Sequence, residues 1–345
     1  MSDRTIQIRD IVAERGVKRR GFIKIGETGV GPIQIPVVIV NGTEPGPVLC
    51  LTAGVHAAEY PAMAAVMQMS QQLVPEGLAG AVIAVPVVNP PMFQARAAFT
   101  SPIDGLNLNR TFPGRPDGSI TEVIAHTIIN EVVKQATHYI DCHGGDVTEI
   151  LWPYAGYRLT GNPDLDQTGE AMVRVYTPRI FALYQEGTPL SPTKGASIEA
   201  ASSEGVISML AECGSAGGLD PADVRTHLNG ITNVMRFLKM LPGEPEMGTD
   251  RLLATGQFIV QAHRGGMVRL SVQIGDEVRK GQELGAINDV FGDVVEKLYA
   301  PEDGIVRIIW TPKVVNSGDS ILKCWTVRPA PPFQSTDRFA AGSSR

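Results

Sequence analysis

The sequence predicts an α/β fold followed by a smaller all-β module. From about residue 20 to residue 240, short apolar runs alternate with longer segments of helical pattern, which is typical of a mostly parallel sheet covered by helices. After residue 250 the pattern changes to short β-like runs separated by glycine turns. The segment Pro242-Gly243-Glu244-Pro245 lies between the two patterns. We therefore expect a first domain over residues 1–245, a second over residues 246–330 and a flexible tail over residues 331–345.

The expected strands of the first domain are short apolar runs bounded by turn residues. A glycine-rich turn over residues 27–31 joins the first two runs, which predicts a strand pair. The later runs are apolar at nearly every position, as in strands that are buried on both faces. We expect strands at residues 21–26, 33–42, 47–54, 81–89, 138–142 and 207–213.

Three helices are expected between or after these strands. Residues 61–73 have the length and composition of a helix. Ser119 and Glu122 have the spacing of a capping box, which predicts a helix from there to about Ala136. Asp220 precedes Pro221 as an N-cap precedes a proline in the first turn, and this helix should extend to about residue 241.

The all-β module contains a weak internal repeat. Residues 266–268 lead to a Gly-Asp turn at residue 275, and residues 304–306 lead to a second Gly-Asp turn at residue 318. Two related halves predict a small pseudo-symmetric barrel or sandwich. The stretches 275–287 and 300–306 resemble parts of lipoyl and biotinyl carrier domains, but residues 288–293 between them contain no lysine for attachment. We expect a carrier-like barrel that acts as a lid or shapes the substrate site.

Composition excludes several classes of function. The chain of 345 residues has 30 Lys and Arg against 36 Asp and Glu, a formal charge of -6, and no basic cluster for nucleic acid. No stretch approaches the roughly 18 apolar residues of a membrane span, and the N-terminal residues lack the apolar region of a signal peptide. The four cysteines form no CxxC motif. We expect a cytoplasmic protein without a nucleic-acid or membrane partner.

Candidate metal ligands follow two of the predicted strands. His56 and Glu59 lie where an apolar strand ends and a helix begins, the position at which open α/β sheets bind ligands. Imidazole and carboxylate suit Zn²⁺, although a His and a Glu three residues apart also occur at ordinary helix starts. His143 ends a later strand and is followed by two glycines, so it can supply a third ligand at the same edge. The remaining histidines are expected at the surface or in packing: His126, His138, His227 and His263.

Two further segments carry candidate functional residues. Asn109 and Arg110 belong to a loop, and an Arg fork beside an Asn matches the geometry of a carboxylate. A structural ion pair explains the same arginine equally well. Glu212 ends an otherwise apolar strand, where a carboxylate is costly unless it has a partner or a catalytic task. The residues alone do not distinguish a structural role of Glu212 from a catalytic one.

Four motifs in order resemble the succinylglutamate desuccinylase/aspartoacylase family, a branch of the zinc carboxypeptidase-like superfamily. They are GVHAAE at residues 54–59, NLNRTFPG at 107–114, DCHGG at 141–145 and AECG at 211–214. Residues 100–122 are particularly similar to the subgroup that includes the deacetylase of N-acetyl-2,4-diaminobutyrate. The resemblance covers roughly residues 20–325. It implies a carboxypeptidase-like mixed sheet with helices on both faces and a C-terminal all-β barrel-sandwich module over the active site.

The resemblance also implies roles for individual residues. His56, Glu59 and His143 would bind one zinc ion per chain and leave an open coordination position. Glu212 would be the general base, and Asn109 and Arg110 would hold the substrate carboxylate. The arginine that polarises the scissile carbonyl in many aspartoacylases is replaced here by Pro102. Arg96 is a candidate for that role, against the alternative of an ordinary surface arginine.

The implied function is zinc-dependent hydrolysis of a small N-acyl amino acid. The alternative within the enzymes is a carboxypeptidase-like metallopeptidase, which requires an open cleft for a chain. A zinc- or amino-acid-binding protein without catalysis is the alternative from another class, and the presence of Glu212 beside three ligands argues against it. The sequence does not specify the acyl group, the amino acid, the oligomeric state or movement of the β module, and a homo-oligomer remains open.

Overall fold

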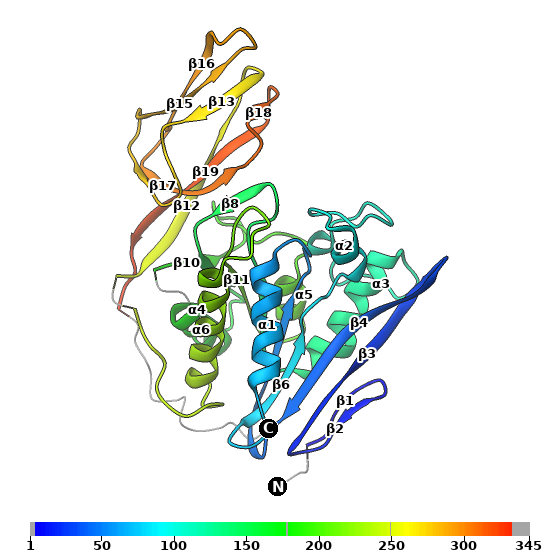
Figure 1. Cartoon of the computed structure of the whole chain (residues 1–345). Coiled ribbons are helices and arrows are strands. Elements are labelled where there is room, and N and C mark those ends of the chain that lie inside the picture. The colour runs from blue at the N-terminus through cyan, green and yellow to red at the C-terminus, as the bar shows by residue number, and fades with distance from the viewer. Residues whose placement is uncertain (1–3, 177–178, 249, 333–345) are drawn as a thin grey trace.

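The structure is a computed structural model that describes residues 4–176, 179–248 and 250–332. Most strands of these residues form one mixed sheet (Figure 1). Its strands are β3 (Val17–Thr28), β4 (Gly31–Asn41), β5 (Glu44–Ala53), β6 (Ala79–Val85), β7 (His138–His143), β8 (Glu149–Leu151), β9 (Tyr154–Arg158), β10 (Ile180–Tyr184), β11 (Ile207–Glu212), β12 (Leu252–Gln261), β14 (Glu277–Val278), β17 (Gly304–Trp310) and β19 (Ser320–Pro329). Their order is β14-β17-β19-β12-β10-β9-β11-β7-β5-β6-β4-β3, and β8 pairs with β17 beside this path.

The centre of the sheet is parallel, as are the β9–β10 and β10–β12 pairs, while the remaining pairings are antiparallel. Strands β6, β5, β7 and β11 pair in parallel, so their carboxyl ends meet at one edge. The β3–β4, β4–β6 and β11–β9 pairs are antiparallel. All six strands predicted in the first domain are present, but the sheet is mixed overall. Strands β8 to β10 were not predicted, because they are short and β8 and β9 also carry charged residues.

Helices cover both faces of this sheet. One face packs against α1 (Tyr60–Gln72), α4 (Pro163–Tyr176) and α6 (Pro221–Phe237), and the other against α3 (Ile120–Thr127), η2 (Ile128–Val132), η3 (Val133–Gln135) and α5 (Ser197–Ser203) (Figure 1). Two shorter helices, α2 (Pro90–Ala95) and η1 (Leu108–Arg110), complete the set in the described ranges. None of the helices in these ranges combines the length and apolar character needed to cross a membrane.

Strand β5 shows why both faces need covering. Leu49 and Leu51 belong to the apolar core on one face, whereas Val48 and Cys50 belong to the core on the other. Alternate side chains of a strand point to opposite faces, so a continuous apolar run requires two layers of helices.

One predicted helix ends as expected and another ends early. The helix predicted to begin at Ser119 starts as α3 and continues through η2 and η3, so it ends near Ala136 as expected. Glu122 Oε2 accepts the backbone N–H of Ser119 at 2.8 Å, which is one half of the predicted capping box. Helix α6 ends at Phe237, earlier than predicted, and Lys239 just beyond it has a left-handed φ of 56°.

The C-terminal residues form a β module that projects from one end of the α/β part (Figure 1). Strands β16 (Val294–Tyr299), β15 (Glu283–Asn288), β13 (Gly266–Leu270) and β18 (Val314–Val315) make a four-stranded sheet in that order. Residues from both sheets share one apolar core, including Phe258, Leu284 and Leu322. The predicted repeats interlock, because β14 of the first half pairs with β17 and β18 of the second half pairs with β13.

The large sheet continues from the α/β part into this module. Strand β10 pairs in parallel with β12 at Ile180 and Leu252.

At the opposite end of the chain, β1 (Ile6–Ile8) and β2 (Ile11–Ala13) form a separate hairpin. The division of the chain at residue 245 stays a prediction. Of the predicted tail over residues 331–345, residues 333–345 lie outside the described residues.

Candidate active site at the carboxyl ends of the parallel strands

The predicted metal ligands come together where two neighbouring parallel strands end. His56 lies in the turn after β5, Glu59 is the N-cap of α1, and His143 is the last residue of β7. Strands β5 and β7 are paired up to Ala53 and Cys142, which brings the two segments that follow to the same edge. This is the edge at which open α/β sheets place their ligands.

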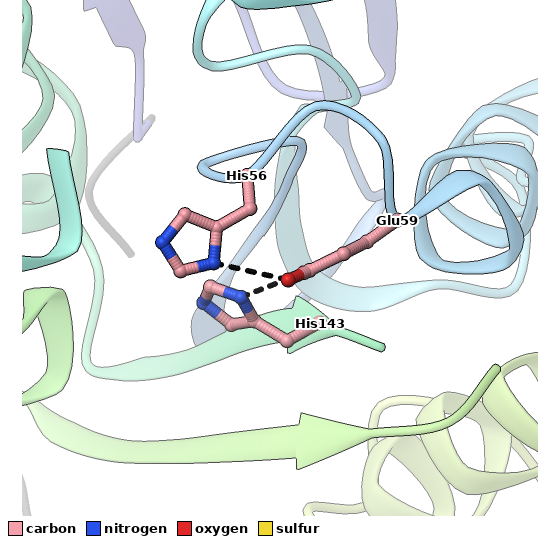
Figure 2. Close-up of side chains that lie close together, drawn as sticks. All are labelled: His56, Glu59 and His143. Atoms are coloured by element: carbon pink, nitrogen blue, oxygen red, sulfur yellow. Dashed lines mark hydrogen bonds and ion pairs between the residues drawn. The ribbon is translucent and has the colours of Figure 1, made fainter. Parts of the chain in front are cut away.

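His56, Glu59 and His143 form a buried cluster (Figure 2). One potential ligand atom from each residue lies within 4.8 Å of the others. The two carboxylate oxygens of Glu59 face the two rings: Oε1 lies 3.0 Å from Nδ1 of His56, and Oε2 lies 2.9 Å from Nδ1 of His143. The backbone N–H of Gly144 also donates to Glu59 Oε2, at 3.1 Å.

The other nitrogen of each ring also faces an oxygen. Nε2 of His56 lies 3.0 Å from Oδ1 of Asn107, and Nε2 of His143 lies 3.0 Å from Oδ2 of Asp141. Since these oxygens are acceptors, they favour a proton on each Nε2 and leave the Nδ1 lone pairs directed at the Glu59 carboxylate. Lone pairs and carboxylate oxygens repel one another unless a proton or a metal cation lies between them. The donor set therefore fits a metal ion with two nitrogen ligands and one oxygen ligand.

A buried histidine holds the backbone beside this cluster. Nε2 of His227, on α6, donates to the backbone oxygens of His143 and Cys213 at 3.0 and 3.2 Å. Its Nδ1 accepts the hydroxyl of Tyr176 at 2.8 Å, and burial lowers the pKa of His227 to about 4. The neutral ring thus connects the ends of β7 and β11, which agrees with the predicted packing role.

Glu212 lies directly beside the cluster. It ends β11 and is the register partner of His143 on β7. Burial raises the pKa of Glu212 well above its ordinary value, although the charge of Arg307 opposes the rise. The Tyr154 hydroxyl donates to Glu212 Oε1 at 3.3 Å. No salt bridge holds Glu212 among the described residues, so its carboxylate is available for a task other than a structural ion pair.

A cavity of about 240 Å³ opens onto the cluster and Glu212. Asn109 and Arg110 also line it, and the Asn109 side-chain oxygen accepts the backbone N–H of Ser197 at 3.1 Å. Arg110 is exposed at the edge of the cavity, and its terminal nitrogen donates to the backbone oxygen of Asn109 at 2.6 Å. The structure therefore brings six of the seven predicted residues to one cavity.

Arg96 is the predicted residue that the structure does not bring there. It caps the end of α2 with a left-handed φ of 52°, its side chain is exposed, and it does not line the cavity. The Arg96 guanidinium thus does not face the space in which a carbonyl would be held. This placement agrees with the alternative of a surface arginine.

Several residues at the cavity were not predicted from sequence. The β module contributes Gln257, Arg307, Ile308, Lys323 and Trp325, and the α/β part adds Glu149, Tyr154 and Glu199. Asn107 and Asp141 orient the two histidines and lie inside motifs that the sequence had already singled out. The β-module residues belong to no local motif, so only the folded chain shows that they reach the cavity.

A protonatable carboxylate beside a cluster of potential metal ligands in one cavity is an arrangement found in hydrolases. Comparison with known proteins agrees with this class. Residues 45–238 match the succinylglutamate desuccinylase/aspartoacylase catalytic domain. The chain therefore belongs to the succinylglutamate desuccinylase/aspartoacylase family, and its family and relatives indicate an amino-acid deacylase.

Similar proteins match over nearly the whole chain. The N-alpha-acetyl-L-2,4-diaminobutyric acid deacetylase of Halomonas elongata is 31% identical over 319 residues, which cover 88% of this chain and 90% of the relative. The product-bound ectoine utilization protein EutE of Ruegeria pomeroyi has a TM-score of 0.82 at 26% identity, covering 89% of this chain and 95% of that one. A succinylglutamate desuccinylase/aspartoacylase from Rhodobacter sphaeroides has a TM-score of 0.81 at 26% identity, covering 91% and 96%.

Proposed function

We propose that this protein is a zinc-dependent hydrolase that removes the acyl group from a small N-acyl amino acid. The observation that carries the proposal is the position of Glu212. Its carboxylate lies beside the His56, Glu59 and His143 cluster and lines the same cavity. Amide hydrolysis by this route needs a metal site and a proton acceptor that both reach the attacked carbonyl.

The metal site fits zinc, with one ion per chain. Two imidazole nitrogens and a carboxylate are the ligand set of many catalytic zinc sites, which keep a further position open. Zinc held there would act as a Lewis acid toward the carbonyl and lower the pKa of water at the site. Asn107 and Asp141 would fix the ring orientations through the Nε2 contacts at 3.0 Å.

Glu212 would carry the proton between water and the leaving amine. Its raised pKa, caused by burial, brings it toward the range in which a carboxylate can both accept and return a proton near neutral pH. The Tyr154 hydroxyl, 3.3 Å from Oε1, would hold one oxygen in place and leave the other to accept the proton of the attacking water.

Asn109 and Arg110 would bind the α-carboxylate of the amino acid. Both line the cavity, and Arg110 presents its guanidinium at the cavity edge where a substrate enters. A planar guanidinium can bind the two oxygens of a carboxylate together. Arg96 takes no part in this arrangement, because it does not line the cavity.

The likeness to the Halomonas elongata deacetylase favours an acetyl group on a diamino acid. Such a substrate adds a side-chain ammonium group to its carboxylate. Glu149 is a partly buried carboxylate that lines the cavity, and no hydrogen bond or ion pair of its side chain to another described residue is present. We therefore assign Glu149 to the side-chain ammonium.

The mixed sheet agrees with the carboxypeptidase-like fold that we propose. The cavity, however, favours a small substrate over a peptide. Side chains from β12, β17 and β19 of the β module help to line a cavity of about 240 Å³, which is small for a chain. The presence of β-module residues in the cavity supports our proposal that the module shapes the substrate site. We also propose that the chain divides into two domains near residue 245. All four cysteines are free and buried, as expected for the cytoplasmic location that we propose.

A panel of N-acyl amino acids tests this function. The zinc-loaded protein would be incubated with acetyl, succinyl and aromatic acyl derivatives of diaminobutyrate, aspartate and glutamate while released amine is measured. We expect the acetyl derivative of diaminobutyrate to react fastest. Hydrolysis of C-terminal residues from peptides, without action on the acyl amino acids, would favour the metallopeptidase instead. Zinc binding without turnover of any compound would indicate a binding protein.

A further inference from the structure

Arg307 is a buried cation that the β module inserts into the cavity. It lies within β17, is 7% exposed and lines the cavity together with Glu212. Its guanidinium carbon lies 4.0 Å from the ring centre of Tyr154 and 4.2 Å from that of Trp325. The two aromatic rings fix the position of the guanidinium through cation–π contacts.

The guanidinium of Arg307 makes no hydrogen bond or ion pair with another described residue, although its charge acts to lower the pKa of both Glu149 and Glu212. Its Nε is buried without a hydrogen bond, and no carboxylate lies within ion-pair distance. Four carboxylates nevertheless line the same cavity, those of Glu59, Glu149, Glu199 and Glu212. A buried charge without a partner is costly, and cation–π contacts offset only part of that cost. An anionic oxygen of a ligand would complete the site.

We propose that Arg307 binds the acyl carbonyl oxygen of the substrate and stabilises the negative charge that develops there. The inference rests on the proposed hydrolase function. It fills the role left open by Pro102 and by Arg96, which does not line the cavity. Arg307 lies far along the chain from the four motifs, so the sequence gives no indication that it reaches the cavity.

Tyr154 gives the reason for choosing the carbonyl oxygen over the carboxylate. Its hydroxyl contacts Glu212 and its ring contacts Arg307, so both groups lie within the length of one tyrosine side chain. Water activated by Glu212 attacks the carbonyl carbon, and the charge appears on the oxygen bonded to that carbon. A cation that stabilises this oxygen must therefore lie close to the base. Arg110, on η1, already offers a separate cation for the carboxylate.

Kinetics of Arg307→Met and Arg307→Lys test the assignment. Methionine keeps an unbranched side chain between the two rings without the charge, so we expect kcat to fall roughly 10²- to 10³-fold, as when one oxyanion donor is removed. KM and zinc content should change little, and the melting temperature should not fall, because the substitution removes a buried charge. Lysine should restore part of kcat. Arg269→Met is the matched control, because Arg269 is an exposed arginine of β13 outside the cavity.

Two kinetic outcomes would overturn the proposal. An unchanged kcat in Arg307→Met would show that the charge plays no part in catalysis. A raised KM with unchanged kcat would place Arg307 on the carboxylate of the amino acid.

A binding measurement separates this proposal from the proposed function. Sodium acetate, the carboxylate form of the acyl group, would be titrated into metal-free protein at constant ionic strength while tryptophan emission is followed. Trp325 lies against Arg307, so we expect a saturable change in the wild type and in Arg269→Met, and none in Arg307→Met. If the wild type hydrolyses no acyl amino acid, the proposed function is wrong. The acetate titration still shows whether Arg307 binds an anion. No response in the wild type, or an equal response in Arg307→Met, would refute the site.

Discussion

Asp141 Oδ2 accepts a hydrogen bond from Nε2 of His143, two residues further along the same strand, at 3.0 Å. The two side chains lie on one side of β7, because alternate residues of a strand share a face. Asp141 is fully buried, and it also accepts the hydroxyls of Thr52, at 2.6 Å, and Ser197. These bonds hold the carboxylate rigid, and it in turn holds the His143 ring with Nδ1 toward Glu59.

We expect Asp141→Ala to weaken metal binding roughly 10- to 100-fold, which is the usual effect of losing the partner of a histidine ligand. Competition with a chelator of known affinity measures this change. Ser197→Ala is the control, because it removes one bond to Asp141 but leaves the contact with His143, so its effect should be smaller. Equal metal affinity in folded Asp141→Ala and wild type would show that the ring needs no such support.

Glu212→Gln tests the general base. Glutamine keeps the size and can still contact Tyr154, but it cannot accept a proton. We expect normal zinc content and substrate binding with a kcat lowered about 10²-fold or more. His143→Ala is the comparison, since loss of a ligand should remove both the metal and the activity. A Glu212→Gln protein with near-normal kcat would exclude the proposed mechanism, and a lower melting temperature with normal kcat would indicate a structural carboxylate.

Arg110→Ala should affect binding more than chemistry. The arginine is exposed at the cavity edge, so we expect KM to rise roughly tenfold, the scale of one charge-assisted hydrogen bond, with little change in kcat. A substrate whose α-carboxylate is replaced by an amide should be nearly indifferent to the substitution. Comparing the two substrates on the same two proteins checks this. Equal losses for both would mean that Arg110 supports the loop instead of the ligand.

The sequence predicted the metal cluster because its residues are marked locally. His56 follows a strand, Glu59 opens a helix, and His143 precedes two glycines, and the parallel pairing of β5 with β7 then places them together. Glu212 could be predicted as a carboxylate in an apolar strand. The sequence could not separate a structural role of Glu212 from a catalytic one. The argument for a catalytic role depends on its register with His143 and on the absence of a salt bridge to Glu212 among the described residues.

The residues of the β module could not be predicted in the same way. Arg307 and Lys323 lie in mainly apolar strands, and no functional motif surrounds either residue. Their position at the cavity depends on how the module sits on the α/β part, through pairings such as β8 with β17, which are remote in sequence. Arg96 shows the converse, because closeness in sequence to the Asn109 loop did not bring it to the cavity.

Lys323 is a partly buried lysine at the cavity whose charge should cost stability. Burial lowers its pKa to about 8, and the charge of Arg307 adds to the decrease. The ordinary pKa of lysine is 10.5, so between about pH 8 and pH 10.5 the unfolded state binds more protons than the folded state. The free energy of unfolding contributed by this group therefore rises with pH across that interval, and the destabilisation is fully present below about pH 8.

Lys323→Met removes the charge while keeping an unbranched side chain. We expect its free energy of unfolding to exceed that of the wild type at pH 7 and the difference to shrink as the pH approaches 10.5. Urea unfolding at several pH values, on metal-free protein, measures the difference. Lys297→Met is the control, because Lys297 is exposed on β16 and its pKa is raised by a hydrogen bond with Glu283. If Lys323→Met and the wild type differ by the same amount at pH 7 and pH 10, Lys323 ionises as an ordinary surface lysine and the cavity does not suppress its charge.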